Sequence, residues 1–65
     1  MERIMYSYQY STRKGDKWGK WERDYDTEWK TLKRAQDVLS QFRETYGDSM
    51  RFRIIKVIEK IEVVE

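Results

Sequence analysis

Two stretches of strict alternation, joined by a tight turn, constrain the fold of this chain more than any other feature of its sequence. In residues 4–12 the side chains of Tyr6, Tyr8 and Tyr10 fall on one face, and those of residues 5, 7, 9 and 11 fall on the other. In residues 19–29 the alternation returns, with Trp21 and Trp29 on one face. A period of two is typical of a β-strand buried on one side. The two stretches therefore predict a pair of strands with one aromatic face.

The segment between the stretches, Lys14-Gly15-Asp16-Lys17, predicts a β-hairpin, because Gly-Asp is an accepted two-residue hairpin loop. If Lys14 pairs with Lys17, the expected register brings the two aromatic faces together. In that register Tyr10 faces Trp21, Tyr8 faces Arg23, Tyr6 faces Tyr25 and Ile4 faces Thr27. On the opposite side Arg13 faces Trp18, an arrangement that favours a cation–π contact.

After Trp29 the period of the apolar residues changes to that of a helix. The residues that follow helical spacing are Leu32, Ala35, Val38, Leu39, Phe42 and Tyr46. Thr31 is the expected N-cap, with a start at Thr27 as the weaker alternative, and Gly47 is the expected αL C-cap. The sequence thus predicts a helix over about residues 32–46.

The last segment, residues 50–64, is rich in β-branched residues and predicts a third strand. Its apolar residues change face: Phe52 and Ile54 share one side, whereas Ile55, Val57, Ile61 and Val63 share the other. Either a bulge lies near Ile54 and Ile55, or both faces are covered over part of the strand.

The order of these elements predicts a single α+β domain over residues 1–65 with the order ββαβ. A right-handed crossover through the helix places the third strand beside the first, which gives a three-stranded antiparallel sheet of order 2-1-3. One helix packs on one face, where Leu32, Leu39 and Phe42 should meet the aromatic side chains. The other face is expected to stay open unless a partner covers it.

Catalysis is disfavoured by the residue inventory. The chain has 65 residues with no His and no Cys, so the commonest general base, the best nucleophile and Cys/His zinc ligands are missing. A domain of this size also offers little room for a closed pocket. We expect no enzyme activity, no catalytic residue, no cofactor, no metal and no small-molecule substrate.

An acidic row on the second alternating stretch is expected to be a solvated strand face that deters aggregation. A weak divalent-metal site, or a surface that imitates a phosphate backbone, is the alternative. The row consists of Glu22, Asp24, Asp26 and Glu28.

No apolar run approaches the ~18 residues of a membrane span, and no signal-like segment opens the chain. The sequence therefore predicts a soluble protein with no membrane partner.

The formal net charge is only +2, from 14 Lys and Arg against 12 Asp and Glu, so bulk charge does not favour nucleic-acid binding. Two local basic groups are nevertheless candidates for phosphate contacts. The hairpin-tip group is Arg13, Lys14, Lys17 and Lys20, beside an exposed Trp18. The helix-start group is Lys30, Lys33 and Arg34, where positive charge opposes the helix dipole. Solubility of the tip, and pairing of the helix-start group with Asp26 and Glu28, are the alternatives.

The C-terminal strand is the main candidate for protein contacts, since a long edge strand with apolar residues on both faces is normally blunted in a monomer. Pairing with a second copy or another protein would cover it. Homodimerisation is therefore expected. The predicted partner-binding residues are Trp18, Ile55, Val57, Ile61 and Val63.

Two resemblances add to these observations. The segment Trp29-Lys30-Thr31-Leu32-Lys33-Arg34-Ala35, preceded by Trp18-Gly19-Lys20-Trp21, resembles the arm-type DNA-binding domain of integrases, which implies DNA binding. That family, however, completes three strands before its helix. The hairpin, the helix and the final Arg51-Phe52-Arg53-Ile54 resemble small uncharacterised bacteriophage proteins, which implies an accessory factor that binds host machinery.

The leading hypothesis is thus a small non-enzymatic binding protein, a phage accessory factor that binds and modulates or inhibits a host protein in the bacterial cytoplasm. The alternative is a small nucleic-acid-binding module that uses the hairpin tip and the helix start.

Overall fold

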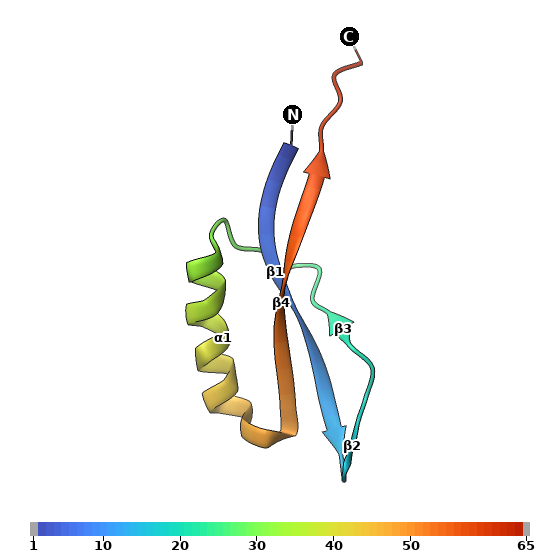
Figure 1. The fold of residues 1–65 in the computed structure, drawn as a ribbon, viewed down its shortest axis with the longest axis vertical. Helices are drawn as coiled ribbons and strands as arrows, with labels where there is room; N and C mark the ends of the chain where they lie inside the picture. Colours follow the sequence, from blue (N-terminus) through green and yellow to red (C-terminus); the bar gives the residue numbers. More distant parts are fainter. Residues whose placement is uncertain (1, 65) are drawn as a thin grey trace.

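The computed structural model describes residues 2–64 and shows the predicted α+β fold, an antiparallel sheet with one helix on one face (Figure 1). The elements are β1 (Glu2–Lys14), β2 (Lys17–Trp18), β3 (Glu22–Arg23), α1 (Leu32–Tyr46), a 3₁₀ turn η1 (Gly47–Ser49) and β4 (Met50–Lys60). β1 is central: β4 pairs with one edge, and β2 and β3 pair with the other. The predicted strand order is confirmed, with the second strand present as two short pieces.

The β1–β4 ladder is continuous from Glu2 opposite Lys60 to Thr12 opposite Met50. Of the two alternatives for this strand, the bulge near Ile54 and Ile55 does not occur. Instead both faces of β4 are partly covered: Phe52 is buried beneath α1, and Ile55 is half-buried on the other face. Apolar residues on both sides of β4 therefore fit one unbroken strand.

Helix α1 has the predicted bounds because both of its ends carry local stop signals. The side chain of Thr31 accepts a hydrogen bond from the backbone N–H of Arg34 (3.2 Å), as an N-cap does. Gly47 takes a φ of 55° and its N–H bonds to the carbonyl of Arg43. Its ψ of −129° lies outside the expected αL region, in a conformation that glycine adopts far more readily than other residues.

The core is a small aromatic cluster between α1 and the sheet. The ring of Tyr8 lies 5.5 Å from Phe42, 5.7 Å from Trp29 and 6.3 Å from Phe52, centroid to centroid. Leu39 is fully buried beside this cluster. Leu32 was expected in the core but is 43% exposed, because it begins the helix at its outer end.

The predicted hairpin register holds only at the tip. Lys14 pairs with Lys17 and Arg13 with Trp18, but farther along Tyr10 pairs with Glu22 instead of Trp21. Between the two pieces the N–H of Gly19 bonds to the carbonyl of Thr12 (2.9 Å), and one extra residue enters the second strand. The predicted pairings of Tyr10, Tyr8, Tyr6 and Ile4 are therefore wrong, because one inserted residue moves Trp21 to the face opposite α1.

The predicted continuous second strand is also interrupted beyond Arg23. Asp24 accepts hydrogen bonds from the backbone N–H of Asp26 (3.0 Å) and the hydroxyl of Thr27 (2.7 Å), which turns the chain before it bridges back from Trp29 to Tyr6. The acidic residues thus do not form a row on one strand face. Only Glu22 lies in a strand.

The face opposite α1 is partly covered by the chain itself, contrary to expectation. The hydroxyl of Ser11 donates to the carbonyl of Gly19, and that of Ser7 donates to the carbonyl of Thr27, both at 2.6 Å. Both serines are fully buried and Met5 is nearly so. Serine at these two positions lets the segment after β2 lie close against β1.

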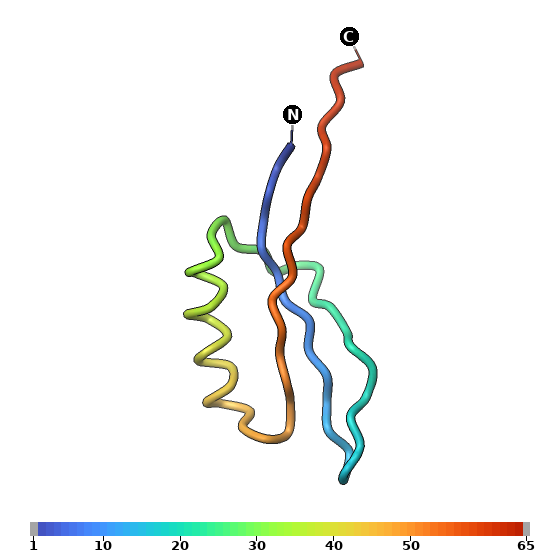
Figure 2. Tube along the Cα trace, in the orientation of Figure 1, coloured from blue at the N-terminus to red at the C-terminus, as the bar shows by residue number. Residues whose placement is uncertain are grey.

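The molecule is long and thin, with principal extents of 54 × 23 × 14 Å. Figure 2 shows the hairpin tip at one end and both termini at the other, where the β1–β4 ribbon extends beyond α1. The two ends therefore present different surfaces.

Candidate nucleic-acid interface

Two tryptophans and two arginines stack together on the face opposite α1. The guanidinium carbon of Arg51 lies 4.8 Å from the ring centroid of Trp18 and 4.7 Å from that of Trp21, and that of Arg53 lies 4.1 Å from Trp21. These distances are within the range of cation–π contacts. We name these four residues the Trp–Arg cluster.

Two strands, β2 and β4, and the loop between β2 and β3 supply the residues of the Trp–Arg cluster. Arg51 and Arg53 are two residues apart on β4, so they share a face, and they lie opposite Ser11 and Gln9 of β1. Gln9 Oε1 accepts a hydrogen bond from Arg53 Nε (2.6 Å). Trp18 comes from β2, and the inserted residue after Gly19 brings Trp21 to the same side. The cluster thus depends on the departure from the expected register.

Stacking holds the guanidinium groups in place while both arginines stay exposed to solvent. A stacked guanidinium keeps in-plane N–H groups that match the geometry of phosphate oxygens. Trp18 is 39% exposed, so part of one indole is also accessible. The cluster therefore combines phosphate donors with an aromatic surface.

The hairpin tip next to the cluster carries the predicted basic group, which we name the basic tip: Arg13, Lys14, Lys17 and Lys20. Lys14 and Lys17 lie directly opposite each other in the ladder, an arrangement of like charges that destabilises a sheet. Lys14 and Lys20 line a shallow groove of about 350 Å³ together with Glu22. Positive charge thus lies on both faces of the tip.

The predicted cation–π contact between Arg13 and Trp18 does not form. The two residues pair as expected, but Arg51 occupies the face of the Trp18 ring. Arg13 Nε instead donates to the carbonyl of Gly15 (2.7 Å). Arg51 and Arg53 were not among the predicted nucleic-acid-binding residues, and their Arg-x-Arg spacing on a strand was the available signal.

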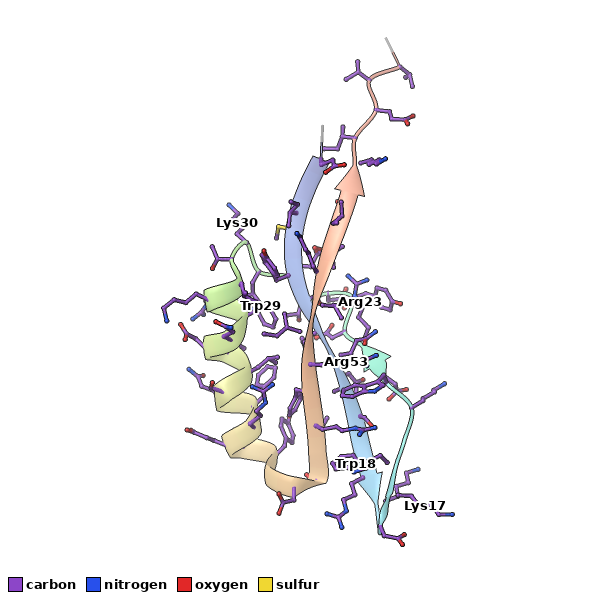
Figure 3. The ribbon with its side chains drawn as sticks, viewed as in Figure 1. Lys17, Trp18, Arg23, Trp29, Lys30 and Arg53 are labelled. Atoms are coloured by element: carbon purple, nitrogen blue, oxygen red, sulfur yellow. The ribbon has the colours of Figure 1, made fainter. Side chains whose placement is uncertain are left out.

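The helix-start group lies apart from the basic tip. Figure 3 shows Lys30 beside the start of α1, at the opposite end of the helix from Lys17 and Trp18. Lys33 pairs with Asp37 one turn along the helix (3.4 Å), instead of with Asp26 or Glu28. The two predicted basic groups are thus separate surfaces.

The predicted protein-contact residues fall into three settings. Ile61 and Val63 are exposed near the C-terminal end, with Val63 at 84%. Ile55 and Val57 are half-buried on β4. Trp18 belongs to the Trp–Arg cluster, at the other end of the molecule.

A second hollow, of about 500 Å³, lies on the helix side between α1 and the turn after β3. Its lining includes Tyr8, Asp24, Phe42 and Tyr46. Burial and the hydrogen bond to Asp24 (3.2 Å) raise the pKa of Tyr8 to about 12, whereas the bonds from Thr27 and Asp26 lower the pKa of Asp24. These bonds fix the turn, and they leave Tyr8 a neutral donor.

Among residues 2–64, no group of three or more His, Cys, Asp or Glu is placed to hold a metal ion. No helix within this part of the chain is long and apolar enough to cross a membrane. Comparison with protein-family models, curated proteins and solved structures finds no match to this chain.

Proposed function

We propose that this chain is a nucleic-acid-binding protein that contacts the phosphate backbone through the Trp–Arg cluster and the basic tip. It acts by binding, without chemistry on its ligand. The observation that carries the proposal is uncompensated positive charge. Within residues 2–64 the two ion pairs are Arg3–Glu59 and Lys33–Asp37, so no cation of the cluster or the tip has a carboxylate oxygen within 4.0 Å.

Uncompensated cations on a preorganised surface favour a polyanionic ligand. Each phosphate that Lys or Arg neutralises releases counterions, and this release drives most sequence-independent nucleic-acid binding. Stacking on Trp18 and Trp21 reduces the freedom that Arg51 and Arg53 lose on binding. The like-charge pair Lys14–Lys17 costs stability at the tip and is offset when phosphate binds there.

The test is fluorescence anisotropy with labelled single- and double-stranded oligonucleotides between about 50 and 200 mM salt. Arg51→Gln/Arg53→Gln should weaken binding about tenfold or more, and should reduce the steepness of the log–log salt dependence by about 2. Lys30→Gln/Lys33→Gln is the matched control, since it removes the same charge from the helix-start group. Equal losses in the two variants, or no binding at low salt, would contradict the proposal.

A second candidate function is the binding of a protein partner, favoured by the exposed apolar side chains near the C-terminus. Ile58 is 56% exposed and Val64 is 90% exposed. A phage accessory factor that binds a host protein remains a prediction from resemblance. The same observation supports homodimerisation.

A further inference from the structure

The outer edge of β4 carries backbone groups that point away from the sheet. Tyr6 exchanges two backbone hydrogen bonds with Trp29 (2.8 and 2.7 Å), and Thr12 accepts one from Gly19. Even-numbered residues of β1 thus direct their backbone toward β2 and β3, and odd-numbered residues direct theirs toward β4. Because Val57 lies opposite Met5, odd-numbered residues of β4 bond to β1 and even-numbered ones point outward.

One contact confirms, near the start of β4, that even-numbered residues direct their backbone groups outward. Arg43 Nη2 donates to the carbonyl of Phe52 (3.4 Å), an even-numbered residue of β4. This side chain covers the edge beside α1. Farther along, Ile58 and Lys60 have the same outward polarity in the part of the ribbon that extends beyond the helix (Figure 1).

The sequence at this end of β4 is complementary to itself in one antiparallel register. With Ile61 on a two-fold axis, Lys60 of one copy lies opposite Glu62 of the other, and Ile58 lies opposite Val64. Both pairs join even-numbered residues: Ile58 and Lys60 direct their backbone groups outward in β4, and Glu62 and Val64 would do the same if the strand continued past Lys60. The register thus matches hydrogen-bonding polarity, charge and apolar character together.

The neighbouring two-fold registers are disfavoured. Moving the axis by one residue places Lys60 opposite Lys60 or Glu62 opposite Glu62, and like charges directly opposite each other destabilise a strand pair. Of these three registers, only the one centred on Ile61 pairs Lys60 with Glu62 and places no like charges opposite each other at the axis.

From this complementarity we infer that residues 58–64 form an antiparallel strand pair with a second copy of this chain. The pairing covers the apolar side chains most exposed in the single chain, Val63 and Val64 among them. It also extends β4 beyond Lys60, its present end. The resulting assembly is about 80–90 Å long, with one basic tip at each end. The inference does not depend on nucleic-acid binding.

The test is charge reversal followed by sedimentation equilibrium of the full chain at about 150 mM salt. The wild-type chain should be a dimer, and Lys60→Glu or Glu62→Lys alone should each weaken it about tenfold or more, because each makes two like-charge pairs. An equimolar mixture of the two variants should form a heterodimer of wild-type affinity, since every cross-strand pair is again opposite in charge. The double variant should form homodimers.

Lys56→Glu is the matched control, because residue 56 points outward but lies outside the paired segment; its dimer should persist. Circular dichroism should show the same fold for every variant. A wild-type monomer at concentrations of about 1 mM would overturn the inference, as would failure of the mixture to restore assembly. In that case, residues 58–64 would instead be expected to pair with a different protein.

Discussion

Asp24 determines the course of the chain between β3 and α1. Its carboxylate accepts hydrogen bonds from the backbone N–H of Asp26, the hydroxyl of Thr27 and the hydroxyl of Tyr8, at 3.0, 2.7 and 3.2 Å. A side chain that satisfies the backbone in this way offers the chain an alternative to the sheet ladder. One aspartate therefore ends a strand that the alternation alone would continue to Trp29.

The bonds to Asp24 make stability dependent on pH. They lower the pKa of this carboxyl below its ordinary value of 3.8, the bond from Thr27 contributing most. A lowered folded-state pKa adds stability that is present above the unfolded pKa and is lost as the pH falls through the folded one. Asp24→Asn should therefore unfold more easily than wild type at pH 7, and the difference should shrink as the pH falls below 3.8.

Urea unfolding at pH 7, 4 and 2 measures this difference. Asp26→Asn is the control, because the structure shows only its backbone N–H, and not its carboxylate, in the turn. Equal destabilisation by the two substitutions at pH 7 would contradict the role given to Asp24.

At the scale of elements, local signals predicted the helix and non-local contacts determined the strands. The bounds of α1 follow from Thr31 and Gly47, whose effects act within one helical turn. The second strand was mispredicted because the insertion at Gly19 and the turn at Asp24 depend on Thr12 and Tyr8, which belong to β1. The alternation of residues in the sequence does not show where hydrogen bonds of this kind replace regular strand pairing.

The N-cap of α1 provides the test at this scale. Thr31→Ala removes the acceptor for the N–H of Arg34 and should lower the free energy of unfolding by about 1 kcal/mol, measured by urea denaturation. Thr31→Ser keeps a hydroxyl and should stay within a few tenths of a kcal/mol of wild type. Indistinguishable stability of the two variants would show that the cap does not support the helix.

At the scale of the whole molecule, the two ends are specialised differently. The hairpin end carries the Trp–Arg cluster and the basic tip, to which Trp18 and Lys17 of Figure 3 belong. The opposite end carries the exposed apolar side chains of Ile58, Val63 and Val64. In the inferred dimer the two basic ends lie far apart, so under the proposed function one nucleic acid would be bound bivalently only if it spanned both ends. Single-chain affinity is then a lower limit for the assembly on a long ligand.

Only part of this arrangement was predictable from the sequence. The basic tip follows from four cations around one hairpin turn, which are close in sequence and in space. The Trp–Arg cluster was missed because Arg51 and Trp18 are distant in sequence and because the expected register placed Trp21 under α1. The inserted residue brings Trp21 close to Arg51, and this contact can be recognised only when the pairing of the strands is known.

Nucleic-acid binding through the Trp–Arg cluster is tested most directly by the three indole N–H signals in a ¹H–¹⁵N spectrum during titration with an oligonucleotide at about 50 mM salt. Trp18 and Trp21 belong to the proposed interface, whereas Trp29 lies against Tyr8 on the helix side. We expect saturable shifts for Trp18 and Trp21, little change for Trp29, and loss of these shifts in Arg51→Gln/Arg53→Gln. Unchanged signals for Trp18 and Trp21, or equal shifts for all three indoles, would contradict it.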